Sequence, residues 1–153
     1  MLRIVMRSYD RMIQTLSGPI VEGFMLLSVR VALAGVFWRS GRTKVEEGSW
    51  LTISDITYDL FRDDYSNVPI PPDFAAVVAT LSEHLFPILL ILGLFTRLSA
   101  LALLGMTMVI QFYVFPDAWW QMHALWVALG ATLIVRGGGF ISLDPQLVKW
   151  ARR

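Results

Sequence analysis

Cysteine is absent from this chain, and charged residues make up only 16% of it. The absence of cysteine excludes disulfide bonds, thiolate metal sites, cysteine-ligated iron–sulfur clusters and dithiol redox chemistry. The formal net charge is only +1, which gives no indication of nucleic-acid binding. The sequence also lacks a nucleophile–base pair, a phosphate-binding glycine loop and a metal-binding motif, so it predicts no metal site. Any electron chemistry would therefore need a bound cofactor or a partner protein.

The chain is instead rich in apolar surface. Hydrophobic residues make up 56% of it, with six tryptophans and nine phenylalanines, whereas an ordinary soluble domain is roughly 45–50% apolar. Four apolar segments approach the ~20 residues that a helix needs to cross a ~30 Å hydrocarbon core. They cover residues 20–38, 74–95, 98–115 and 119–135. A small soluble helical protein is the alternative, but four near-continuous apolar runs exceed what such a core can bury.

The connections between these segments predict how they are arranged. Residues 93–97 and 115–119 form short corners, so the second, third and fourth segments run antiparallel to one another. We therefore expect an all-α integral membrane four-helix bundle with up-down topology, which forms a single domain over residues 1–153.

The N-terminal segment 1–19 is predicted to be an amphipathic helix in the lipid headgroup layer. Arg3, Arg7 and Arg11 recur every four residues and share one helical face, while apolar residues cover much of the other side. The segment lacks the continuous apolar stretch of a signal peptide. Ser17-Gly18-Pro19 is expected to end this helix and turn the chain into the first span. A frayed, solvent-exposed tail is the alternative.

The connection 39–73 between the first and second spans is predicted to be a long outer loop. It carries seven acidic residues against four basic ones. A structureless loop of that length is unusual in a compact protein, so we expect a short helix within it. Ser54 is its candidate N-cap, and the helix is expected to run through Phe61. Ile56, Leu60 and Phe61 are expected to rest on the membrane surface.

The distribution of positive charge predicts how the chain crosses the membrane. Eight lysine and arginine residues lie in the N-terminus, the corner at Arg97 and the C-terminus, against four in the outer loop. The positive-inside rule then places both termini in the cytoplasm. The basic residues Arg39, Arg42 and Lys44 directly after the first span weaken this prediction.

Five polar residues inside the apolar segments mark the candidate site, because charged and hydrogen-bonding groups are costly in a bilayer. They are Arg30, Glu83, His84, Gln111 and His123. At ~1.5 Å per residue from the outer end of each span, Arg30, Glu83 and His84 share a level ~12–15 Å deep, whereas Gln111 and His123 lie ~6 Å deep. Glu83 is the only carboxylate at the level of Arg30, so we predict an ion pair between them. This layer either fixes the helix register or lines a functional pocket.

The neighbours Glu83 and His84 point about 100° apart on a helix, so they cannot both face one partner, although both can line a shared cavity. Haem ligation by His84 and His123, or a metal site completed by Glu83, is disfavoured because the two histidines differ in depth by ~9 Å. A quinone fits better, because a histidine and a carboxylate in an aromatic-lined membrane cavity can hydrogen-bond both carbonyl oxygens and move protons. Candidate walls, whose alternative role is an interfacial belt, are Trp38, Phe86, Tyr113, Trp119, Trp120 and Trp126.

Three motifs in this sequence resemble those of the DoxX family of small bacterial integral membrane proteins. They are residues 30–38 followed by Ser40-Gly41 and Lys44, residues 83–97 with their Gly-Leu-Phe-Thr-Arg corner, and residues 139–144 with their Ser-Leu-Asp. The three motifs occur in order and cover most of residues 25–144. The resemblance implies a four-helix protein of the bacterial inner membrane, in which Arg30, Glu83 and Arg97 are the family's polar positions.

The resemblance also implies an accessory subunit more than an autonomous enzyme. Family members are associated with quinone-linked sulfur oxidation, terminal oxidase complexes and oxidative-stress membrane complexes. We therefore expect a quinone-associated accessory subunit that lies in the lipid bilayer and contacts a redox or periplasmic protein. The alternative is a non-catalytic scaffold or assembly factor that recruits a periplasmic partner through residues 49–73. A small-solute transporter is disfavoured, since four spans leave little room for a path unless the chain forms a homo-oligomer.

Overall fold

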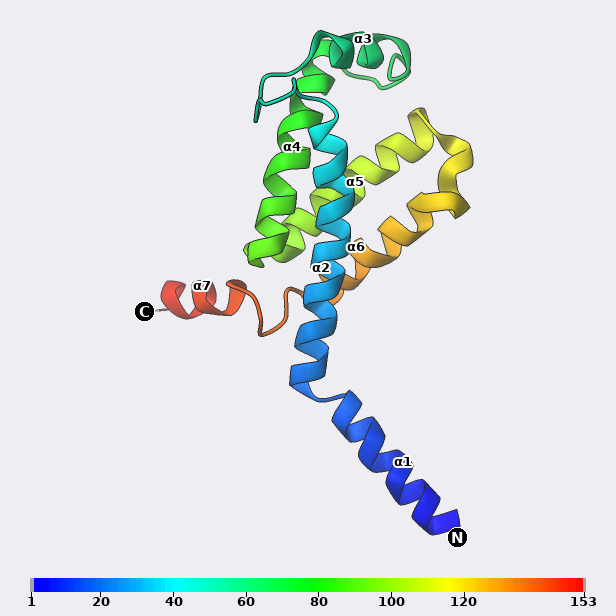
Figure 1. Ribbon diagram of the computed structural model, residues 1–153, viewed down its shortest axis with the longest axis vertical. Coiled ribbons are helices and arrows are strands. Elements are labelled where there is room, and N and C mark those ends of the chain that lie inside the picture. Colours follow the sequence, from blue (N-terminus) through cyan, green and yellow to red (C-terminus); the bar gives the residue numbers. More distant parts are fainter. Residues whose placement is uncertain (1, 153) are drawn as a thin grey trace.

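The computed structural model describes residues 2–152, which form a helical protein (Figure 1). Met1 and Arg153, part of the predicted domain, lie outside this description. The helices are α1 (Leu2–Leu16), α2 (Pro19–Arg42), α3 (Asp55–Asp63), α4 (Pro72–Leu92), α5 (Thr96–Tyr113), the 3-10 turn η1 (Pro116–Ala118), the π-helical turn η2 (Trp119–His123), α6 (Ala124–Arg136) and α7 (Asp144–Ala151). Within residues 2–152, β-structure is limited to one bridge between Val45 and Ile53.

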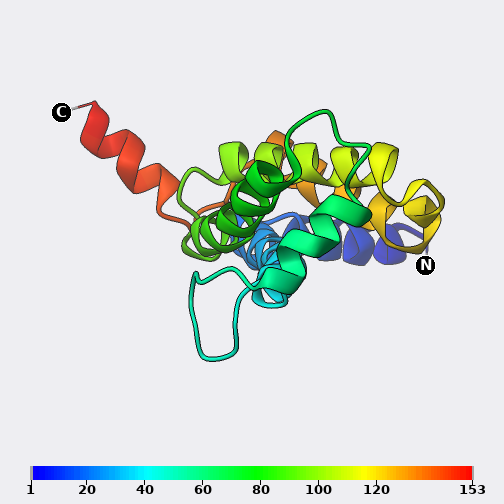
Figure 2. The same ribbon diagram turned by 90° about the horizontal axis from the view of Figure 1, so that it is seen from above.

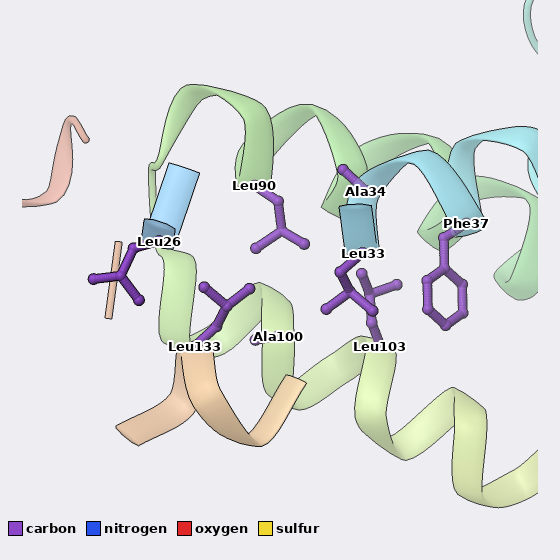
Figure 3. Packing of buried hydrophobic residues seen from close by; sticks show 8 residues of the cluster. All are labelled: Leu26, Leu33, Ala34, Phe37, Leu90, Ala100, Leu103 and Leu133. Atoms are coloured by element: carbon purple, nitrogen blue, oxygen red, sulfur yellow. The ribbon is translucent and has the colours of Figure 1, made fainter. Parts of the chain in front are cut away.

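Helices α2, α4, α5 and α6 form the predicted four-helix bundle. Helix α2 packs against α4 and α6, and α5 packs against the same two helices. Leu33 and Phe37 of α2 meet Leu90 of α4, Leu103 of α5 and Leu133 of α6 in a core whose members are at most 1% exposed (Figure 3). Because lipid tails are as apolar as these side chains, close van der Waals packing holds such helices together in a membrane.

Four helical stretches are long and apolar enough to cross a membrane, and they correspond to the four predicted spans. They are Pro19–Arg42, Pro72–Leu92, Thr96–Tyr113 and Pro116–Arg136. Their outer faces carry large apolar side chains, and Leu98, Phe112 and Leu125 are each more than 60% exposed. An apolar surface of this extent is unfavourable in water and suits contact with lipid.

The first span is longer than the sequence predicts, because α2 continues through Arg42 instead of ending at Trp38. The hydropathy of the sequence falls at Arg39, but α2 continues beyond this residue because it packs against α4. A Cβ atom at Gly41 would lie 3.0 Å from the His84 ring and 3.1 Å from Glu83 Cβ, so the two helices approach closely at this glycine. This contact fixes the register of α2 against α4.

The bundle has two different ends. The loop end carries residues 43–71 and the turn formed by η1 and η2, and the termini end carries the corner between α4 and α5, residues 137–143 and helices α1 and α7 (Figure 1). Toward the loop end, α5 and α6 lean away from α2 and α4, as both views show (Figures 1 and 2). The two helix pairs are therefore in closest contact near the termini end.

Helix α1 begins and ends close to its predicted bounds, and Ser17 and Gly18 separate it from α2. The side chains of Arg3 and Arg7 are exposed, while that of Arg11 lies outside the described part of the chain. The location of this helix in the headgroup layer stays a prediction.

The predicted short helix in the outer loop is confirmed as α3. The Ser54 side chain accepts a hydrogen bond from the Thr57 amide at 3.4 Å, as expected of an N-cap. The prediction that Phe61 rests on the membrane surface is wrong, because its ring is only 2% exposed and packs against Ala75 and Ala76 of α4. Ile56 is 79% exposed. One face of α3 therefore packs against the start of α4, and the opposite face is exposed.

The termini end is held together by polar contacts around Gly93, which has a φ of 66° and terminates α4. The Gly93 carbonyl accepts hydrogen bonds from the amides of Leu143 and Asp144 at 3.0 and 2.9 Å. The Asp144 carboxylate in turn accepts from the first amide of α5, that of Thr96, at 3.1 Å. The C-terminal Ser-Leu-Asp motif therefore caps the corner between α4 and α5.

We expect Gly93→Ala to destabilise the protein by about 2 kcal/mol or more, since a left-handed residue with a side chain is strained. The new Cβ would also collide with the guanidinium of Arg30 and with Ser142. Thermal unfolding in detergent, followed by circular dichroism, measures the effect.

Gly105→Ala is the matched control, because a Cβ at this exposed α5 glycine meets nothing within 4 Å. The control should unfold at an unchanged or slightly higher temperature. Equal losses in both variants would contradict the specific role of Gly93.

Candidate functional site

A cavity of about 520 Å³ opens at the loop end, where α5 and α6 lean away from α2 and α4. Its walls include the aromatic rings of Phe37, Phe115 and Trp126. Ionisable groups from distant parts of the chain line the same cavity, among them Glu83 of α4, Asp117 of η1 and His123 of η2. Its volume lies within the range of roughly 300–1,000 Å³ that is usual for small-molecule sites.

Glu83 is neutralised by Lys44, which follows the end of α2. The Lys44 ammonium lies 2.7 Å from the Glu83 carboxylate, and both side chains are at least 90% buried. The ammonium also donates a hydrogen bond to the Ser40 hydroxyl at 2.9 Å. An ion pair this deeply buried depends on both partners, because either charge alone would be left unsolvated.

The outer loop positions Lys44 through its backbone. The Lys44 carbonyl accepts hydrogen bonds from the Ser54 amide at 3.1 Å and from the Thr57 hydroxyl at 2.9 Å. Both donors belong to the first turn of α3 and its N-cap. The short helix in the loop therefore fixes the residue that compensates the buried carboxylate.

The predicted ion pair between Arg30 and Glu83 is wrong. The prediction set the outer ends of the first two spans at one level, but Gly41 of α2 is the residue that packs beside Glu83. Arg30 precedes Gly41 by eleven residues, which places it ~16 Å farther toward the termini end at 1.5 Å per residue. The axial offset between α2 and α4 separates the two charges.

Arg30 instead completes the termini end. Its side chain is fully buried and donates hydrogen bonds to the carbonyls of Leu90 at 3.2 Å and Ile91 at 3.4 Å, and to that of Ile141. Leu90 and Ile91 belong to the last turn of α4, where the Leu90 carbonyl also accepts a hydrogen bond from the Gly93 amide at 3.1 Å. A cation there also offsets the negative end of the helix dipole. Arg30 therefore joins the end of α4 to residue 141 and lies remote from the cavity at the loop end.

Gln111 and His123 lie together, at the boundary between α5 and η2. The Gln111 amide nitrogen donates to the Pro116 carbonyl at 2.6 Å, so its amide oxygen faces His123. His123 Nδ1 lies 2.7 Å from that oxygen and must carry the hydrogen. In the neutral ring Nε2 is then an acceptor, and this buried atom has no partner among residues 2–152.

His84 lies apart from this group. Its Nδ1 donates to the Thr80 carbonyl at 2.7 Å, and its buried Nε2 has no partner in the described chain. The ring packs edge-on against Trp38 at a centroid distance of 5.3 Å and lines a separate cavity of about 400 Å³ with Trp50. The adjacent Glu83 and His84 therefore face different cavities, as the angle of about 100° between neighbours on a helix requires.

The sequence did not single out Tyr65, which lines the 520 Å³ cavity from the outer loop. Burial raises the pKa of the Tyr65 phenol to about 12, with smaller contributions from the negative charges of Glu83 and Asp64. The phenol is therefore protonated at neutral pH and can donate a hydrogen bond. Lys44 was noted in the sequence as part of a motif and of the basic residues after the first span. Its pairing with Glu83 could not be predicted, because it depends on the fold of the loop.

We expect Lys44→Met to destabilise the protein by about 3–5 kcal/mol, because it leaves the buried Glu83 carboxylate without a counter-charge. The double variant Lys44→Met/Glu83→Gln should recover most of this loss, since it removes both charges. Unfolding in detergent micelles measures the four stabilities of the double-mutant cycle.

Arg39→Met is the control, because Arg39 is exposed at the end of the same helix. If the stability changes caused by the Lys44 and Glu83 substitutions were additive, the two side chains would not interact, and the ion pair would be contradicted.

Comparison with known proteins identifies the family to which this chain is related. A family model described as DoxX matches residues 25–116. The chain is 33% identical over 136 residues to an uncharacterized protein of Haemophilus influenzae, with 84% of this chain and 86% of the relative covered. No solved structure matches. Since the family model spans more than half of the sequence and the structure has four membrane-spanning helices, this chain belongs to the DoxX family of multi-pass membrane proteins.

Proposed function

We propose that this protein binds a quinone in the 520 Å³ cavity at the loop end and serves as an accessory subunit of a membrane redox complex. The observation that supports this most is that three of the polar residues lining one aromatic cavity are of complementary type. They are Glu83, His123, whose buried Nε2 has no partner within residues 2–152, and Tyr65, whose phenol is protonated.

The polar groups suit both forms of such a ligand. A quinone accepts hydrogen bonds at two carbonyl oxygens and, when reduced, carries two hydroxyl groups in their place. Tyr65 supplies a donor for a carbonyl oxygen, whereas His123 Nε2 is an acceptor for a hydroxyl. The apolar walls at Phe37 and Trp126 suit an aromatic ring.

The ion pair beside the cavity supplies a place to hold a proton. Glu83 can accept a proton from the cavity, and Lys44 holds the carboxylate in position at 2.7 Å. Without cysteine the chain holds no cysteine-ligated iron–sulfur cluster. We therefore infer that the electrons are exchanged with a partner protein, which makes the chain an accessory subunit.

We also propose that both termini lie in the cytoplasm of a bacterial inner membrane. The termini end carries most of the lysine and arginine residues, including Arg97, Arg136 and Lys149. The quinone cavity then lies near the periplasmic face.

The experiment is native mass spectrometry of the purified protein with a short-chain ubiquinone. His123→Asn should weaken binding about tenfold, because asparagine keeps an N–H donor for Gln111 but lacks the acceptor at Nε2. Tyr65→Phe should weaken it by a similar factor through the loss of the phenol donor. His84→Asn is the control, because His84 lines a different cavity.

The role in electron transfer is tested with Glu83→Gln in the native complex. We expect the loss of quinone-dependent turnover in Glu83→Gln and in Lys44→Met/Glu83→Gln, which removes both charges, while the helix content of the double variant measured by circular dichroism is unchanged. Unchanged turnover in a folded Glu83→Gln protein, or equal effects of His123→Asn and His84→Asn, would refute the proposal.

A second candidate function, a scaffold that recruits a periplasmic protein, is favoured by the apolar surface of the outer loop. Trp50, Leu51 and Ile56 are 70%, 54% and 79% exposed. Exposed apolar groups on an acidic loop suit a protein partner. We propose this role as the alternative to the redox role.

The scaffold role predicts that Trp50→Ser/Ile56→Ser removes a stoichiometric partner from the complex extracted in mild detergent, whereas Glu83→Gln leaves it bound. Intact-complex mass spectrometry measures both. Retention of the partner by the loop variant would contradict the scaffold role.

A further inference from the structure

A second hollow, of about 500 Å³, lies at the termini end and is lined by basic residues. We call it the basic cleft and define it by Arg97, Arg136, Lys149 and Arg152 together with the glycine segment 137–139. The cleft is at the opposite end of the bundle from the proposed quinone cavity. It is not part of the function proposed above.

The positive charge of the basic cleft is only partly compensated. Arg136 pairs with Glu22, to which its Nε donates at 2.9 Å. Asp144, the acidic residue of the lining, already caps the Thr96 amide. The other three basic residues, Arg97, Lys149 and Arg152, form no ion pair within residues 2–152. Such a concentration of like charge favours an anionic ligand.

The position of the basic cleft at the end of two spans indicates which anion it meets. Arg136 is the last residue of the fourth span and Arg97 the second residue of the third. Both therefore lie at the edge of the hydrocarbon layer, where the phosphate groups of lipids are concentrated. Arginine forms bidentate hydrogen bonds with phosphate, and lysine adds a point charge.

Helix α7 gives the basic cleft a second wall. It leaves the bundle sideways, roughly across the axis of α2, in both views (Figures 1 and 2). Pro145, Val148, Lys149 and Arg152 recur at helical spacing and form its cleft-facing side. The apolar Leu147 and Trp150 lie on the opposite side by the same spacing, and Trp150 is 75% exposed. Tryptophan beside basic residues is typical of helices at the membrane interface.

The glycine segment lets the side chain of Arg97 pack against the backbone and so positions it in the basic cleft. Gly137 and Gly139 have φ values of 77° and 75°, and the guanidinium of Arg97 lies over Gly137, within 3.3 Å of where a Cβ would be. A side chain at Gly137 would therefore crowd the arginine in the cleft.

We propose that the basic cleft binds the phosphate headgroup of an anionic phospholipid, with α7 lying along the membrane interface beside it. Arg97, Lys149 and Arg152 hold the phosphate. The exposed apolar side chains Phe140 and Val148, which are 57% and 48% exposed, lie where acyl chains can contact them. A lipid satisfies both the charge and the apolar rim, whereas a soluble anion satisfies only the charge.

The test is retention of lipid by the full-length protein, released from nanodiscs that contain phosphatidylglycerol and phosphatidylcholine in equal amounts and weighed by native mass spectrometry. The unaltered protein should retain phosphatidylglycerol preferentially. Lys149→Gln/Arg152→Gln should weaken that retention about 30-fold, since each basic residue near an anionic surface contributes roughly a fivefold factor.

Arg3→Gln/Arg7→Gln is the matched control, because it removes the same charge from α1, away from the basic cleft. The control should keep its phosphatidylglycerol. An equal loss in both double variants would show attraction by general charge and would overturn the specific site, as would equal retention of the two lipids by the unaltered protein.

A titration with inorganic phosphate separates a lipid from a soluble anion. Retained phosphatidylglycerol at millimolar phosphate supports the lipid site, whereas its displacement together with a bound mass of phosphate overturns it. Quinone binding by Lys149→Gln/Arg152→Gln is measured in the same spectra and should be unchanged. Failure of the lipid proposal is thereby distinguished from failure of the quinone proposal.

Discussion

A carboxylate buried within a membrane-spanning helix must be compensated, and the loop end of this protein is organised around the compensation of Glu83. Lys44 provides the opposite charge at 2.7 Å. The backbone of Lys44 is held by Ser54 and Thr57, so the ion pair depends on the fold of the outer loop. The loop in turn is held to α4 by the buried ring of Phe61. Loss of the Lys44 side chain would leave an unpaired charge next to the cavity.

At each end of the bundle, the buried polar groups of residues 2–152 interact with partners from that end alone. At the termini end, Arg30 and Asp144 satisfy the backbone groups where α4 ends and α5 begins. At the loop end, the polar groups Glu83 and His123 border a cavity between helices that lean apart. The aliphatic core around Leu33 and Leu103 separates the two ends (Figure 3). Because of this division, polar residues of the family motifs such as Arg30 and Glu83 lie at opposite ends of the bundle and need not take part in one site.

The π-helical turn η2 is the local feature that brings His123 to the cavity. Pi-helical turns are rare and are frequent at functional sites, because they expose side chains that a regular helix would direct elsewhere. The Pro116 carbonyl, in the preceding turn, orients Gln111, and Gln111 orients the His123 ring. The chemistry available at Nε2 thus depends on a chain of two hydrogen bonds that begins in a connecting turn.

Much of the fold follows from the sequence, whereas the partners of the polar residues do not. Hydropathy and length identify the four spans, Ser54 identifies the cap of α3, and the glycine at position 93 identifies the corner, because each is a local property of the chain. The partner of Glu83 depends on the axial offset of α2 against α4, which is decided by the close contact at Gly41. Counting positions from the span ends puts Arg30 level with Glu83, whereas the contact at Gly41 puts it ~16 Å away along the helix, and this offset exchanges one partner for another. The sequence by itself determined that the protein crosses the membrane four times and which residues are costly to bury there. Only the tertiary structure decided that Arg30 caps a helix and that Lys44 neutralises Glu83. It also decided that His84 and His123 face separate cavities.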